Sequence, residues 1–373
     1  MEEYKKQIAG FERLSKREIL DCRIKALKEM FHYWGYQINS YELLILCEAI
    51  TFGYGSLNYH HKQIYDVPYM ISTKMDVHRT VFDSLGIKYK TEVIDGTEQG
   101  LLRIKALIKK DFPVLVELDG SIFMKNRKKS ELDLHYISYV LVVGFDDEKQ
   151  EVSIVLTRSS ETDKCITLSY EEFQQARISK CFPYPSIGRC FYLTEAILCT
   201  EEQTKEKIFQ SLERISNVML SGQKGNRIIQ NNIEISNLEW GLIGMKHLAE
   251  RYIKQAILCM LRKKSKVMFQ LEFLIIRNNF QYGTLTGYRS EFYTALMQMG
   301  EKYENPYLEK AGMYIDKSNK GWKRLLYEIG MMAKNRNKIN GLRLMKLVML
   351  TFRIRYLEIK AFRLMRDICT RRK

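Results

Sequence analysis

Two residues of this sequence are well suited to covalent chemistry, Cys22 and His135. A thiol becomes a nucleophile when a histidine takes its proton and a helix N-terminus or a cation favours the thiolate. Asp21 is a good N-cap residue, so the thiol is expected in the first turn of a helix, whose positive end lowers a thiol pKa. A single cysteine on an apolar helix face is more often inert packing. Both interpretations of Cys22 are open at this point.

The helix that carries Cys22 has two candidate starts. Ser15 and Glu18 have the spacing of a capping box, which would start the helix earlier and bury the thiol deeper in it. Asp21 is the alternative cap. In either case the apolar side chains follow at helical spacing, and Gly35 ends the helix; they are Cys22, Ala26, Leu27, Met30, Phe31 and Trp34.

His135 opens a run that is typical of a β-strand, from residue 136 to Gly144. Residues 113–118 and 152–156 are similar strand runs, and a Gly-Phe-Asp-Asp-Glu-Lys turn joins the run 136–144 to the run 152–156. We therefore expect an antiparallel sheet behind a helical front, with the imidazole at the head of a strand. The other histidines are assigned to a polar loop (His60 and His61) or to structural positions in helical patterns (His32, His78 and His247).

This order of elements resembles the papain-like cysteine protease fold, in which a helix carries the nucleophile and a facing strand begins with the base. More narrowly, the chain resembles the BtrH-like acyltransferase family of butirosin biosynthesis. The similar stretches are DCRIKALKEMFHYWGYQINSYELLILCEAITFGYG, FPVLVELDGSIF, LHYISYVLVVGFDDE, GLIGMKHLAERY and GYRSEFYTAL. We also expect the cysteine-protease-like amide synthetase of closthioamide assembly to be a relative.

The resemblance implies an amide-bond-forming acyltransferase of natural product biosynthesis. An acyl group would pass from the thioester of an acyl or peptidyl carrier protein to Cys22, and from there to a small amine. The acyl chain rides on the partner's phosphopantetheine, so the chain itself needs no cofactor, no metal and no ATP at this step.

The residue that orients His135 is either Asp119 or Thr157. Alignment with the family puts Thr157 where an Asp or Asn is expected, and a hydroxyl stabilises an imidazolium less than a carboxylate does. Asp119 ends the neighbouring strand and is the alternative, although an Asp before a glycine is as often a turn residue. Asp146 and Asp147 are assigned to a turn. Lys16 and Arg17 replace the glutamine of papain, so backbone N–H groups at the helix start are the expected oxyanion donors.

The chain has 373 residues, 46% of them apolar, which suits two domains. Strand patterns nearly disappear after residue 199, so we expect an α+β papain-like domain at 1–198 and an α-helical domain at 199–373. Long helical patterns cover 201–220, 239–263, 287–301, 306–316, 319–334 and 340–368. The linker is expected at 181–188 or just after 190–194, because prolines and a glycine interrupt both periodic patterns there.

The net charge of +16 is unevenly distributed. Counting Lys and Arg against Asp and Glu gives about −1 for residues 1–200 and about +17 for 201–373, of which 321–373 contribute about +12. Such a positive surface attracts an acidic partner. A carrier protein is the partner we expect, and nucleic acid is disfavoured because no recognisable reading module accompanies the charge.

The eight cysteines are scattered, without a CxxC pair or zinc spacing, and are expected to be reduced thiols. No apolar run is long enough to span a membrane, and the first residues are charged, so a cytoplasmic protein is expected. Two alternatives to the acyltransferase stay open. One is a cysteine peptidase with the same residues, and the other is a non-catalytic module that binds a carrier protein. The oligomeric state is open as well.

Overall fold

The computed structural model describes residues 4–11, 19, 21–59, 62–69, 77–94, 97–123, 137–155, 165–179, 186, 188–195, 199–224, 228–230, 233–261, 265–282 and 287–371. Internal contacts divide the chain into two compact units. The first comprises Met1–Leu43 and His78–Thr204, and the second comprises Leu44–Val77 and Lys205–Lys373. The units are therefore interleaved in the sequence, in contrast to the predicted ranges 1–198 and 199–373, because residues 44–77 pack with the C-terminal part.

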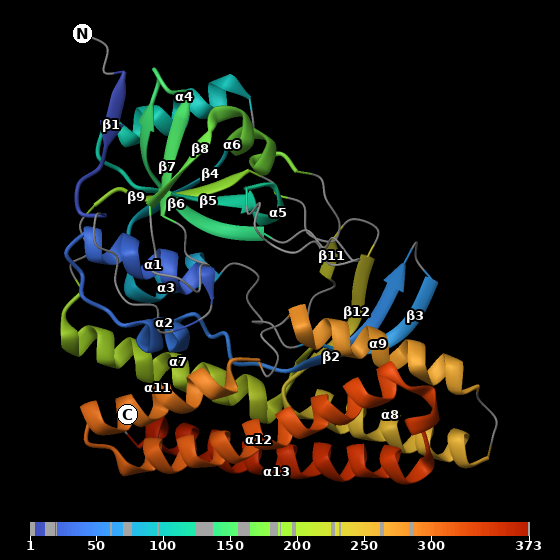
Figure 1. Cartoon of the computed structure of the whole chain (residues 1–373). Coiled ribbons are helices and arrows are strands. Elements are labelled where there is room, and N and C mark those ends of the chain that lie inside the picture. The colour runs from blue at the N-terminus through green and yellow to red at the C-terminus, as the bar shows by residue number, and fades with distance from the viewer. Residues whose placement is uncertain are drawn as a thin grey trace. The chain divides into compact units, whose positions relative to one another are not determined.

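A seven-stranded antiparallel sheet forms the core of the first unit (Figure 1). Its strands are β1 (Lys5–Gln7), β4 (Tyr89–Val93), β5 (Val114–Asp119), β6 (Ile137–Asp146), β7 (Glu151–Val155), β8 (Cys165–Ser169) and β9 (Arg189–Leu193). The order is β4-β9-β5-β6-β7-β8, with β1 also paired to β6. The combination of helices with an antiparallel sheet confirms the predicted α+β class.

Helices cover both faces of this sheet (Figure 1). α1 (Cys22–Tyr33) packs on β6, and α3 (Val77–Leu85) places aromatic side chains on the same face. α4 (Glu98–Ile108) and α6 (Tyr170–Arg177) pack against β5 and β6 from the other side. A short helix, α5 (Gly120–Phe123), follows β5 directly, and α2 (Ser40–Leu46) follows α1 in the chain.

The second unit contains a five-stranded antiparallel sheet that the sequence analysis did not predict. Its strands are β2 (Gly53–Tyr59), β3 (Lys62–Tyr69), β10 (Gln223–Lys224), β11 (Ile228–Gln230) and β12 (Ile233–Trp240). The part of the chain expected to be an α-helical domain, 199–373, therefore contains strands as well as helices. A Cβ at position 53 would lie 2.9 Å from the ring of Trp240, so the glycine provides room for close packing in a strand.

Long helices make up the rest of this unit. They are α7 (Glu201–Ser221), α8 (Leu242–Met260), α9 (Lys266–Tyr282), α11 (Arg289–Lys302), α12 (Pro306–Lys334) and α13 (Gly341–Thr370), with a 3-10 turn, η1 (Arg336–Lys338), before α13. α13 packs between α8 and α12. Asn305 and Asn340 cap α12 and α13, since each side chain accepts hydrogen bonds from backbone N–H groups of the first turn.

One fully buried ion pair lies inside this helical layer. Arg289 donates to both carboxylate oxygens of Glu358 at 3.1 Å, and both side chains are 0% exposed. Ser318 Oγ and Trp322 Nε1 donate to the same carboxylate at 2.8 and 2.9 Å. The guanidinium also donates to the carbonyl oxygen of Thr51 at 2.9 Å. Each buried charge therefore has several partners, which a charge in a protein interior requires.

Among the described residues, none of the helices combines the length and the apolar character that crossing a membrane would take.

Candidate functional site

Cys22 is the first residue of α1, and Asp21 is its N-cap. The Asp21 carboxylate accepts a hydrogen bond from the backbone N–H of Arg23 at 2.8 Å and pairs with the Arg23 side chain at 2.7 Å. Of the two candidate helix starts, the structure has the one at Asp21; Ser15 lies outside the described residues. The half-buried thiol thus lies at the positive end of a helix.

The other described cysteines differ from Cys22 in position, and all of them are free thiols. Cys47, Cys190 and Cys369 are buried, and burial raises the pKa of the Cys190 thiol to about 12. Cys165, Cys199 and Cys259 are more accessible, but none of them begins a helix. Among the cysteines that the structure describes, Cys22 alone is the first residue of a helix.

The charged residues at the start of α1 act on His78 of α3 and on Tyr139 of β6. Beside the larger effect of burial, the Arg23 guanidinium lowers the pKa of His78 and opposes the rise in the pKa of Tyr139, while the Asp21 carboxylate raises the pKa of His78. The His78 ring packs at a tilt against the rings of Tyr139 and Phe191, whose centroids lie 4.6 and 5.2 Å away. Burial is the main cause that lowers the pKa of His78 to about 3, so this imidazole is neutral at physiological pH.

A buried carboxylate on β5 organises the sheet below α1. Glu117 is 2% exposed, pairs with Arg189 at 2.5 Å, and accepts a hydrogen bond from the Tyr139 hydroxyl at 2.6 Å. Burial and the Glu117 carboxylate both raise the pKa of Tyr139 well above its usual range, so the phenol stays protonated. This cluster was not predicted from the sequence. The sign of it there is one charged residue, Glu117, among the apolar residues of 114–118.

Asp119 lies two residues further along the same strand and is 1% exposed. Its Oδ1 atom accepts hydrogen bonds from the backbone N–H and the hydroxyl of Ser121 at 2.9 and 2.7 Å, and Oδ2 accepts one from Ser179 Oγ at 2.5 Å. In the β5–β6 ladder Asp119 is the partner of Ile137. The bonds to Ser121 are those of a turn residue. The bond from Ser179 holds the other oxygen from a different segment of the chain.

Several predicted residues fall outside the described part of the chain. These are His135 and Thr157, together with His60 and His61. His135 precedes the first residue of β6, Ile137, by two positions in the sequence. The structure therefore places Cys22 on a helix that packs on β6 and Asp119 in the strand paired with it, but it gives no geometry for the histidine.

The remaining acidic and histidine candidates have structural partners. Asp146 pairs with Lys5 at 3.0 Å, and Asp147 accepts hydrogen bonds from Lys105 and from the Tyr170 hydroxyl. Asp146 is the last residue of β6, and Asp147 follows it in the turn. His32 lies near the carbonyl oxygen of Ile38, at 3.2 Å. In the second unit, the Nδ1 atom of His247 lies 2.5 Å from Oε2 of Glu239.

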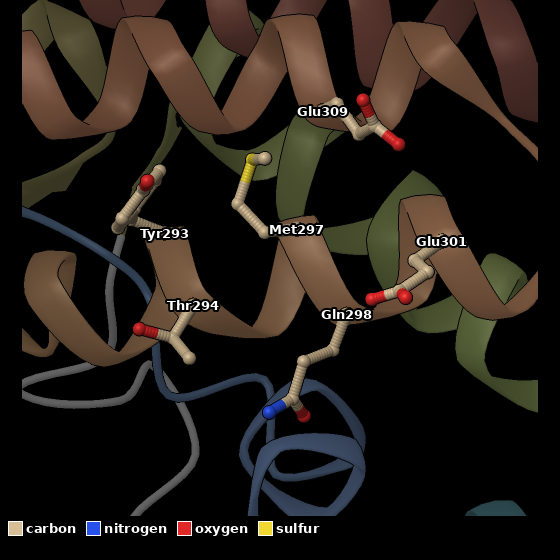
Figure 2. Close-up of a pocket in the computed structure, with 6 residues that line it drawn as sticks. All are labelled: Tyr293, Thr294, Met297, Gln298, Glu301 and Glu309. Atoms are coloured by element: carbon tan, nitrogen blue, oxygen red, sulfur yellow. The ribbon is translucent and has the colours of Figure 1, made fainter.

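A cavity of about 340 Å³ lies elsewhere, in the second unit (Figure 2). It is lined by Tyr293, Thr294, Met297, Gln298, Glu301 and Glu309. The first five belong to α11, and Glu309 belongs to the first turn of α12. Figure 2 shows Met297 and Glu309 between the two helices and Gln298 directed away from them. No thiol or imidazole is among the lining residues, so the cavity does not offer the chemistry predicted for Cys22.

No protein-family model matches the chain, and a search of curated proteins found no match to it. Within the described residues, no group of three or more His, Cys, Asp or Glu side chains is arranged to hold a metal ion.

Proposed function

We propose that the chain is a papain-like cysteine acyltransferase that forms an amide from a carrier-protein thioester and a small amine. The observation that carries this proposal is the position of Cys22 as the first residue of a capped helix that packs on β6, the strand that His135 precedes by two residues. A nucleophilic cysteine and its base need this kind of pairing between a helix end and a strand start.

The reaction we propose has two transfers through one acyl-enzyme. The Cys22 thiolate attacks the thioester carbonyl, the bond to the carrier's phosphopantetheine sulfur breaks, and that thiol leaves with the proton held by His135. The amine then attacks the acyl-Cys22 carbonyl, gives its proton to His135 and releases the thiolate. Neither step changes an oxidation state, and the thioester supplies the driving force without ATP.

The start of α1 suits this chemistry because the N-terminal end of a helix is positive and stabilises a developing oxyanion. The N–H of Arg23 donates to the Asp21 carboxylate and is therefore already used. We propose that other backbone N–H groups near this helix end bind the oxyanion, in place of the glutamine that papain uses.

Asp119 is the orienting residue that the described contacts favour. It is buried, held by Ser121 and Ser179, and paired with Ile137 across the ladder. Thr157 is the other candidate.

The test is intact-mass spectrometry of the full-length protein after incubation with an acyl-loaded carrier protein. We expect a mass increase of one acyl group on the wild type and none on Cys22→Ala, whose small side chain fits a helix start. A subsequent addition of amine should remove the adduct as an amide. Release as a free acid alone would instead define a thioesterase or peptidase-like hydrolase.

Two controls make the result specific. Cys259→Ala removes a half-buried thiol of the second unit and should leave the adduct unchanged. His135→Ala should slow acylation by a factor on the order of 10² or more, because the thiol then lacks its proton acceptor. If the wild type binds the loaded carrier but is never acylated, the chain is a non-catalytic carrier-binding module and the proposal fails.

A further inference from the structure

The outer face of α13 carries a row of exposed apolar side chains. Its members, which we call the α13 stripe, are Leu342, Met345, Met349, Phe352 and Tyr356. Leu342 is 86% and Met349 is 70% exposed. The intervals alternate between three and four residues, which is the heptad spacing of a helix that pairs with another helix. Over 15 residues the stripe is roughly 20 Å long.

The fold of the second unit does not account for this stripe. α13 already packs through its inner face, where Leu344, Leu347 and Ile354 are 0% exposed. Ile354 lies against Gly321 of α12, and Arg355 donates to the carbonyl oxygen of Leu242 of α8 at 2.9 Å. The helix therefore has an apolar inner face, which packs inside the second unit, and an apolar outer face, which is exposed. An apolar row on a surface helix marks an interaction site.

Positive charge borders the stripe on one side. Lys346, Arg353 and Lys360 recur every seven residues and therefore lie along one flank of the stripe. α13 has two acidic residues, Glu358, which is buried against Arg289, and Asp367, which lies beyond the stripe. Lys346 pairs with Glu328 of α12 at 2.5 Å, so the positive charge of the flank is strongest at Arg353 and Lys360.

We infer that the α13 stripe binds an amphipathic helix of a partner protein whose apolar face is bordered by Asp and Glu. Apolar residues at heptad spacing pack against one facing helix, and carboxylates beside that helix's apolar face would meet the row of Lys346, Arg353 and Lys360. The methionines adapt to the shape of the partner's side chains. The inference stands apart from the proposed acyl transfer, because it rests on α13 alone.

The same observations disfavour two other occupants. In an antiparallel pair with a second copy, the two rows of Lys346, Arg353 and Lys360 would face each other, and like charges repel at such positions. An anionic membrane would suit the charge, but helices that lie on membranes bury a broad apolar face. The α13 stripe occupies only two positions of each heptad, and the inner apolar face of the helix is packed inside the unit.

The experiment measures binding of a synthetic peptide to the full-length protein by fluorescence anisotropy. The probe is a three-heptad peptide with Leu at both seam positions and Glu at the flanking positions; its matched control has Lys in place of each Glu. We expect the Glu peptide to bind at least about ten-fold more tightly than the Lys peptide. We expect this preference to shrink as salt rises from about 0.05 M to about 0.5 M.

Two variants locate the binding. Met349→Glu should weaken binding of the Glu peptide by about ten-fold or more, since a charge enters the seam. Met313→Glu changes an exposed methionine of α12, 54% exposed, and should leave binding unchanged. Circular dichroism checks that both variants keep their helices. If Met349→Glu fails to fold, Leu342→Glu replaces it, because that side chain is the most exposed of the stripe.

Four results would overturn the inference: equal affinity for the two peptides, unchanged binding by the stripe variants, a dimer in sedimentation that Met349→Glu dissociates, or cosedimentation with phosphatidylglycerol vesicles that Met349→Glu abolishes. The third would assign the stripe to a second copy of the chain, and the fourth to a membrane surface.

Discussion

Ser179 donates a 2.5 Å hydrogen bond to Asp119 from the segment that follows α6, although the two residues are 60 positions apart in the chain. The bond fixes the Oδ2 atom of a carboxylate at the end of β5. A carboxylate that orients a histidine has to be held in this way, because a freely rotating one loses the geometry that the imidazole needs.

We therefore predict that Asp119→Asn reduces turnover more than Thr157→Ala does. An amide whose oxygen keeps the hydrogen bonds from Ser121 directs its NH2 group at Ser179, whose hydroxyl then has to accept. The amide also stabilises an imidazolium less than a carboxylate does. Steady-state turnover with a loaded carrier, with thermal unfolding as a control for stability, compares the two. A larger loss for Thr157→Ala would assign the orienting role to the hydroxyl, and small equal effects would indicate a Cys–His dyad.

Charge reversal in the second unit tests recruitment of the carrier. Lys338→Glu with Arg343→Glu should raise the apparent KM for a loaded carrier and spare a small thioester that needs no docking surface. Lys346 and Arg343 lie 2.5 and 3.6 Å from Glu328, so part of their charge is neutralised. Glu328→Gln is the matched control and should lower the KM. Equal damage with both substrates would contradict docking at this site.

His78 predicts how stability depends on pH. Its folded pKa is about 3, whereas an unfolded histidine titrates near 6.5. Between these values the unfolded chain binds the proton and the folded chain does not, so stability is lost as pH falls through this window, by up to about 1.4 kcal/mol per pH unit.

Urea unfolding of the wild type and of His78→Phe, each at pH 7.5 and 5.5, measures the effect. The variant should lose less stability on acidification, because a phenyl ring can pack beside Tyr139 and Phe191 without binding a proton. An equal loss of stability in both proteins would mean that groups other than His78 cause the loss of stability at low pH.

Removing one partner of the buried Arg289–Glu358 pair should lower the stability of the fold strongly. Arg289→Met leaves a buried carboxylate without its counter-ion, which typically costs about 3–5 kcal/mol. The double variant Arg289→Met with Glu358→Leu should recover much of that loss, since no buried charge remains. Denaturant unfolding of the two variants and the wild type checks this order. A double variant as unstable as the single one would show that the hydrogen bonds of Ser318 and Trp322 matter more than the charge.

Much of the first unit follows from local patterns in the sequence. β5, β6 and β7 lie where the strand-like runs predict them, because their apolar side chains are buried in a regular sheet. The start of α1 could be narrowed to two caps but not decided, since Ser15 and Asp21 both have suitable side chains. The Glu117 cluster depends on Arg189, 72 residues away, and no local pattern reports such a pair.

The second unit was predicted less well, for reasons that its packing explains. The predicted break between 316 and 319 is absent from α12, because its polar residue Ser318 is buried against Glu358 and Gly321 faces Ile354. These residues interrupt the apolar pattern without interrupting the helix. The strands β2 and β12 pair across more than 170 residues, so neither has a nearby partner that would have indicated a hairpin. His135 and Thr157 stay predictions.

The pairing of β2 with β12 also affects how this chain is made. At typical translation rates of about 5–20 residues per second, the β2–β3 hairpin leaves the ribosome roughly 9–35 s before β12 does. During that interval one edge of the hairpin has no strand to pair with, and unpaired edges are prone to aggregation. The first unit, which resumes at His78, is synthesised in the meantime. Expression of the N-terminal half alone would therefore leave the hairpin permanently without β12, and a chaperone that shields strand edges should improve the yield of the whole chain.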